Sequence, residues 1–314
     1  MTHLRQLFCQ LSPTAQGYVC IVLTMLVWGS FSLLARLNAS WGILAWDIIA
    51  VRFGVSAGLL LPILIYRRTT AFLWQPKAVI LALFGGVGYS SLVYSAFLLA
   101  PVVHGAVFLN GMIPVATALL MLLLLKKRPD HDTKIALILI IITLTLMTAL
   151  MLIKGLSFGV GDVLFVICAC CWAGYGIMLK EWGFSPWQVM CSTAIWSAIL
   201  YLPVYGMLLY LGVGGLGFGG VALSHAIIQG AFHSVMVMIF ATMTYSLAVE
   251  RLGAFFAGGL ASLAPFLSAL LAVPLLGEPL NSVMVLGLIG MGLGTVQPWR
   301  YVGMLKNRLF KSSG

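Results

Sequence analysis

Apolar residues run along the chain in ten long stretches, separated by short breaks that hold most of the charged residues. An α-helix rises about 1.5 Å per residue, so about 20 apolar residues match the hydrocarbon core of a bilayer. The pattern predicts an all-α integral membrane protein with ten transmembrane helices, and the short breaks favour antiparallel neighbours. The predicted helices cover residues 17–37, 45–66, 78–99, 103–125, 134–153, 160–180, 187–210, 225–248, 254–276 and 282–298.

The second half of the chain repeats the design of the first. Pro114 lies in the fourth predicted helix as Pro265 lies in the ninth, and Trp28 in the first helix corresponds to Trp172 in the sixth. We therefore expect two five-helix repeats, residues 17–153 and 154–298. Because five is odd, the second repeat begins on the opposite side of the membrane. Such inverted repeats are typical of secondary transporters with a substrate site near the midplane.

Composition and charge agree with a membrane protein. The chain is 62% hydrophobic and 8% charged, whereas soluble domains have about 25% charged residues. The net charge is +10, and fourteen of the seventeen basic residues fall on one side of the predicted membrane. The positive-inside rule makes that side cytoplasmic, together with the N-terminal segment 1–16 and the basic C-terminal tail 299–314. The excess of positive charge therefore indicates membrane topology and contact with anionic lipids, and not nucleic-acid binding. We expect a bacterial inner (plasma) membrane.

Several segments resemble the EamA-type repeat of the drug/metabolite transporter superfamily, and the resemblance covers about residues 17–298. It implies a ten-helix fold, a central cavity between the halves and transport of small metabolites. The exit motif after the ninth helix departs from a strict repeat, since Gly277-Glu278 corresponds to Lys126-Lys127 in the first half, and the glutamate is present in one copy only. The segments that carry the resemblance are LTMLVWGS, AVRF, APVVHGAVFLNGMIP, GDVLFVICACCWA and GEPL.

Aromatic and polar residues in the middle of the predicted helices are the candidates for substrate binding. Polar groups in hydrocarbon are costly unless they are satisfied, so they face a bundle interior or a wet cavity. Hydrogen bonding between helices and aromatic packing are the alternative roles. The candidates are Trp28, Ser90, Ser91, Tyr94, Asn110, Trp172, Tyr175, His233 and Ser262.

Three of the polar residues have a specific interpretation. The Asn110 amide offers both donors and acceptors to a substrate, or to a neighbouring helix. His233 could bind substrate, carry a proton or be a buried structural residue. His104 lies at the turn before the fourth helix and is interpreted as a loop residue.

A second group of residues suggests gating or structural roles. Arg52 is the basic residue placed well inside a predicted helix, and its partner must come from another helix; Thr193 takes its place in the second half. Pro114 and Pro265 predict a packing kink or a hinge. Glu278 lies at the outer end of the ninth helix, beside Pro279, and is not expected to couple protons.

The placement of the carboxylates and cysteines argues against proton coupling by a carboxylate, cationic substrates, metal sites and disulfides. Asp47, Asp162 and Glu278 fall near outer helix ends, and no carboxylate is expected at mid-membrane. This disfavours carboxylate-based proton coupling and cationic substrates. The six cysteines show neither a metal-ligand spacing nor a disulfide framework, so we expect no metal and no cofactor.

The sequence thus predicts a secondary transporter that moves small neutral or zwitterionic metabolites, such as amino acids and related, often aromatic, compounds, by alternating access, with export as the expected direction. A membrane-embedded enzyme on lipid-linked substrates would need clustered acids, bases or metal ligands, which the sequence lacks. A solute channel is the other alternative. The expected partners are a small-molecule substrate and membrane lipids, and we expect a monomer or homodimer.

Overall fold

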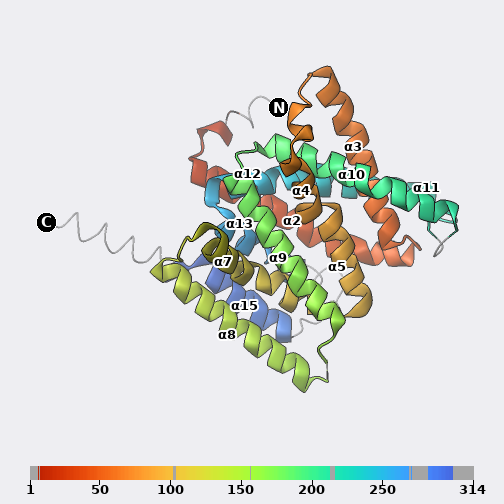
Figure 1. The fold of residues 1–314 in the computed structure, drawn as a ribbon. Coiled ribbons are helices and arrows are strands. Elements are labelled where there is room, and N and C mark those ends of the chain that lie inside the picture. The colour runs from red at the N-terminus through yellow and green to blue at the C-terminus, as the bar shows by residue number, and fades with distance from the viewer. Residues whose placement is uncertain are drawn as a thin grey trace.

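The computed structural model describes residues 6, 8–101, 104–155, 157–212, 216–268, 270 and 282–299, and these residues form helices without a strand (Figure 1). Short breaks separate them, and η2 and η4 are wider, π-helical segments. The helices are α2 (Pro13–Ser40), α3 (Ala45–Tyr66), η1 (Ala71–Trp74), α4 (Pro76–Gly85), α5 (Val87–Leu99), η2 (Gly105–Gly111), α7 (Met112–Leu125), α8 (His131–Ile153), α9 (Val160–Glu181), α10 (Pro186–Tyr210), α11 (Leu223–Ala231), η4 (Phe232–Ala241), α12 (Thr242–Leu252), α13 (Ala254–Ala261) and α15 (Ser282–Val296).

Seven helical stretches in the described residues are long and apolar enough to cross a membrane. They are Ala45–Tyr66, Pro76–Leu99, Gly105–Leu125, His131–Ile153, Val160–Glu181, Pro186–Tyr210 and Leu223–Leu252. Ala254–Ser268 and Val285–Val296 are shorter apolar helices. Large apolar side chains such as Leu123, Ile138 and Ile153 are exposed on the outside of the bundle, as lipid contact requires. The chain is therefore an integral, multi-pass membrane protein.

Local sequence signals explain where several helices begin. The Asp130 side chain accepts a hydrogen bond from the Thr133 amide at 2.9 Å and caps α8. At the start of α10, Ser185 and Gln188 bond each other's backbone amides at 3.3 and 2.9 Å, which is a capping box. Such caps satisfy amides that lack a partner in the first helical turn.

Helices of the two sequence halves pack against each other in matching pairs. α3 packs on α10, and α15 on α8; in Figure 1 the blue α15 runs alongside the yellow-green α8. α2 of the first half packs on α12 of the second half. Their counterparts in the repeat, α9 of the second half and α5 of the first half, pack in the same way. The core is therefore built jointly by both halves.

Glycine and proline set the breaks within two helices. At Gly86, between α4 and α5, an added Cβ would lie 2.1 Å from the Ser197 hydroxyl, which accepts a hydrogen bond from the Val87 amide at 3.0 Å. Pro265 lacks an amide hydrogen and its ring clashes with the preceding turn. Accordingly α13 ends at Ala261, and a turn precedes the proline. Pro114 lies within the continuous α7, directly after η2. Glu278 lies outside the described residues.

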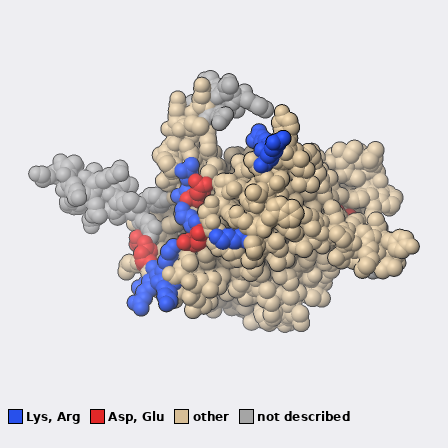
Figure 2. Space-filling model, turned by 45° about the horizontal axis from the view of Figure 1, so that its top comes forward, with Lys and Arg blue, Asp and Glu red and all other residues tan. Residues whose placement is uncertain are grey.

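Charged side chains gather in a band along one side of the face shown in Figure 2, beside a broad uncharged surface. Lys127 pairs with Glu181 at 2.7 Å, which joins the ends of α7 and α9. Lys180 donates to the backbone oxygen of Glu250 at 2.6 Å, which joins α9 to α12. This end of the bundle is thus held by polar contacts between helices of both halves.

Candidate functional site

Five aromatic side chains from four helices meet in the core, and we call them the aromatic cluster. Trp28 comes from α2, Tyr89 from α5, Trp172 and Tyr175 from α9, and Tyr245 from α12. The ring centroids of Trp28 and Trp172 are 5.3 Å apart, those of Trp172 and Tyr245 are 5.2 Å apart, and those of Tyr89 and Trp172 are 4.9 Å apart. Trp172 contacts all four other members, so it is the centre of the cluster.

The helices place these rings together for simple geometric reasons. Trp172 and Tyr175 are three residues apart and therefore share a helix face. Glycines provide the space: a Cβ added at Gly85 would lie 2.4 Å from the Tyr175 ring, and one at Gly176 would lie 3.4 Å from the Tyr245 hydroxyl. The close approach of α4 to α9 thus depends on a residue without a side chain.

Arg52 on α3 adjoins the aromatic cluster. Its side chain is half-buried, and its Nε is buried without a hydrogen-bond partner among the described residues. The titratable groups around its charge are the phenols of Tyr89, Tyr94 and Tyr175 and the imidazole of His233. These residues come from α5, α9 and η4, so Arg52 faces the interior of the bundle.

Reciprocal hydrogen bonds fix the helix that carries Arg52. The Ser56 hydroxyl donates to the backbone oxygen of Ser234 at 3.0 Å, and the Ser234 hydroxyl donates to the backbone oxygen of Val51 at 3.0 Å. The Oγ1 of Thr193, the counterpart of Arg52 in the second half, lies 3.3 Å from the Tyr175 hydroxyl oxygen. Arg52 and Thr193 therefore both lie near Tyr175.

The structure places the other candidates in different surroundings. His233 is buried in η4, Ser90 is buried in α5, and Ser91 is half-buried beside it. The Asn110 amide donates to the Gly105 oxygen at 3.2 Å, and the Ser262 hydroxyl donates to the Gly259 oxygen at 2.6 Å. The first bond stays within η2, and the second joins Ser262, directly after α13, to the last turn of that helix.

The interpretation of His104 as a loop residue is wrong. His104 is 2% exposed, and its Nδ1 lies 2.6 Å from Asp162 Oδ1, which joins the start of η2 to the start of α9. Asp162 Oδ2 also accepts from the Gly159 amide at 2.7 Å. The partners are 58 residues apart, so no local signal could have found the pair.

Sequence reasoning also missed Tyr89 and Tyr245 as members of the cluster. Tyr245 occupies the position in the second half that Tyr94 occupies in the first. The repeat was thus a usable signal for Tyr245. Tyr89 has no such signal, because its inclusion depends on how α5 lies against α9.

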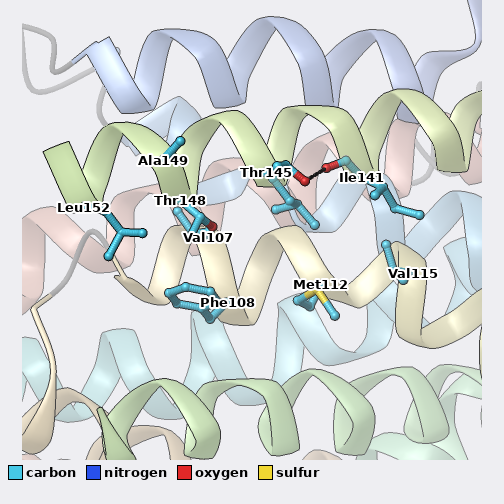
Figure 3. A pocket seen from close by; sticks show the side chains of 10 residues that line it. Val107, Phe108, Met112, Val115, Ile141, Thr145, Thr148, Ala149 and Leu152 are labelled. Atoms are coloured by element: carbon cyan, nitrogen blue, oxygen red, sulfur yellow. Dashed lines mark hydrogen bonds between the residues drawn. The ribbon is translucent and has the colours of Figure 1, made fainter. Parts of the chain in front are cut away.

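A cavity of about 510 Å³ lies away from the aromatic cluster, between η2–α7 and α8. Figure 3 shows Phe108 and Met112 on one side and Thr148 and Leu152 on the other. Its lining is almost entirely apolar, and no charged residue contributes to it. Such a surface suits hydrocarbon, and the hydroxyls of Thr145 and Thr148 are the polar side-chain groups in its lining. Among the described residues, no group of three or more His, Cys, Asp or Glu side chains could hold a metal ion.

Comparison with known proteins agrees with this architecture. One crystal structure of a protein matches with a TM-score of 0.68 and 19% identity over 91% of this chain and 96% of that chain, which shows a shared fold. No curated protein sequence matches the chain. The EamA-like transporter family matches twice, over residues 15–149 and 159–297. These two matches confirm the resemblance to the drug/metabolite transporter superfamily, and the chain belongs to the EamA-like transporter family.

Proposed function

We propose that the protein is a secondary transporter of small neutral or zwitterionic metabolites, such as aromatic amino acids, and that it exports them. The observation that carries this proposal is the aromatic cluster, because Trp28 comes from the first half and Trp172 and Tyr245 come from the second. Tryptophan and tyrosine rings bind other aromatic rings with the ring centroids about 4.5–7 Å apart. A binding site shared by both halves would change its shape when the halves move relative to each other.

The proposed membrane arrangement has ten helices in two inverted five-helix repeats, with both termini cytoplasmic in a bacterial inner membrane. The family matches over each half and the matched helix pairs support the repeats. The one-sided distribution of basic residues supports the orientation.

Alternating access would break one set of interhelical contacts at a time. At one end of α9, Glu181 pairs with Lys127, and at the other end Asp162 pairs with His104. We propose that the aromatic cluster becomes accessible from one side when the contacts at that end separate and those at the opposite end hold. The rings in the cluster would then part to admit substrate.

Counterflow in proteoliposomes tests the transport function. Vesicles loaded with unlabelled phenylalanine should accumulate labelled phenylalanine transiently, and the uptake should saturate. A channel would give equilibration without the transient excess, and an enzyme would alter the labelled compound. Vesicles without protein are the control. Absence of counterflow across a panel of aromatic amino acids would contradict the proposal.

A further inference from the structure

Arg52 presents a charge that the described residues do not neutralise. Its Nε is buried without a hydrogen-bond partner, and Arg52 forms no ion pair with the described acidic residues. A charge inside a membrane bundle is costly unless a partner or water relieves it. Guanidinium has donors only, so what it lacks is an acceptor.

The buried carboxylates of the described bundle form no ion pair with Arg52. Asp47 lies on the same helix as Arg52, but its Oδ1 accepts from the Tyr205 hydroxyl at 2.6 Å and from the Gly217 amide at 2.8 Å, and its Oδ2 is buried without a hydrogen-bond partner among the described residues. Asp162 is bonded to His104. Arg52 therefore has no internal counter-ion within the part of the chain that the structure describes.

The surroundings of Arg52 would suit an anion. The neighbouring groups are the phenols of Tyr89, Tyr94 and Tyr175, which can donate hydrogen bonds to an anionic oxygen. Guanidinium matches a carboxylate with two parallel hydrogen bonds, and charge-assisted bonds of this kind are the strong ones.

Two phenols connect Arg52 with the aromatic cluster. Tyr175 and Tyr89 belong to the cluster, with ring centroids 5.3 and 4.9 Å from that of Trp172, and both are among the titratable groups around the Arg52 charge. A solute that carries an anionic group at one end and a flat apolar group at the other would match both parts.

We propose that Arg52 binds the carboxylate of the transported solute and that the aromatic cluster binds its apolar part. This assigns substrate binding to a residue for which the sequence favoured a structural or gating role. It rests on the proposed transport function, specifies that zwitterionic solutes are recognised by their carboxylate, and extends the substrates to monocarboxylates without an amino group. The amide or ester of such a solute lacks the group that Arg52 binds.

Three matched ligands and three variants test this assignment. The ligands are phenylalanine, its carboxamide, and 3-phenylpropionate, which keeps the carboxylate and lacks the amine. The variants are Arg52→Gln, Arg52→Lys and, as control, Arg67→Gln at an exposed position at the end of the same helix. Half-saturating concentrations are measured by counterflow and by ligand-induced shifts in Tm of the purified protein.

Arg52→Gln should raise the half-saturating concentrations of both carboxylates about tenfold or more, because a hydrogen bond to a charged group is lost. The half-saturating concentration of the carboxamide should change by less than about twofold in Arg52→Gln. Arg67→Gln should give wild-type values for all three ligands. The half-saturating concentrations of the carboxylates for Arg52→Lys should lie between those for wild type and Arg52→Gln, since lysine keeps the charge and loses the two-bond geometry. Arg52→Lys also provides the test if Arg52→Gln does not fold.

Two results would overturn the assignment. If Arg52→Gln or Arg52→Lys weakens the acids and the carboxamide equally, Arg52 acts on the structure and not on the carboxylate, while transport stands. If wild-type protein neither binds nor carries any of the three ligands, the assignment fails together with the aromatic-solute function on which it rests.

Discussion

At the residue scale, the repeat predicted some of the aromatic cluster, and the remaining members depend on packing. Trp28 and Trp172 were paired from sequence because they correspond in the two halves, and their rings lie 5.3 Å apart. The sequence could not indicate that Asn110 bonds its own helix at Gly105, because this depends on the π-helical turn of η2. Contacts between distant residues, such as His104 and Asp162, carry no periodic signal.

Trp172→Ala should shift the preference of the transporter toward larger solutes. The indole contacts the rings of Trp28, Tyr89, Tyr175 and Tyr245, so its removal leaves space at the centre of the cluster. We expect a rise in transport of bulky aromatic solutes relative to phenylalanine, with a loss of stability of about 3–5 kcal/mol if the space stays empty. Counterflow with solutes of graded size measures this ratio. An unchanged ranking in a folded variant would place the site elsewhere.

Gly85→Ala should destabilise the protein. An added Cβ would lie 2.4 Å from the Tyr175 ring, so α4 or the ring must move, at a cost of about 1–3 kcal/mol. Gly58→Ala is the matched control, because nothing lies within 4 Å of its added Cβ. Thermal unfolding of both variants in detergent compares them. Equal Tm values for the two variants would contradict the close packing of α4 on α9.

At the element scale, hydropathy predicted the positions of the long helices well, because lipid forces each span to bond its own backbone. The predicted runs 45–66 and 160–180 match Ala45–Tyr66 and Val160–Glu181. The break at Gly86 and the π-helical segments were not predicted. They depend on side chains of other helices, such as the Ser197 hydroxyl that accepts from the Val87 amide.

The contact between η2 and α9 should depend on both members of the His104–Asp162 pair. His104→Ala leaves the buried Asp162 with its Gly159 bond only, whereas Asp162→Ala removes both bonds. We expect each variant to lower the free energy of unfolding by about 1–3 kcal/mol, and the double variant to cost less than their sum. Thermal unfolding of the two variants, the double variant and the exposed control His131→Ala measures this. Strict additivity would show that the pair is not coupled.

At the scale of the whole molecule, the repeat and the charge distribution lead to a stated orientation, and cysteine labelling tests it. In a variant without native cysteines, Gly219→Cys lies in the loop between α10 and α11, and nothing lies within 4 Å of its added Cβ. Arg128→Cys lies in the exposed, lysine-rich break between α7 and α8. These breaks are separated by three long helical stretches, α8, α9 and α10, so an odd number of crossings puts them on opposite sides.

Because basic residues favour the cytoplasmic side, an impermeant thiol reagent added to intact cells should label Gly219→Cys and miss Arg128→Cys. Permeabilised cells should label both, which controls for reactivity. Labelling of Arg128→Cys alone in intact cells would reverse the orientation, and labelling of both would contradict the odd number of spans between them.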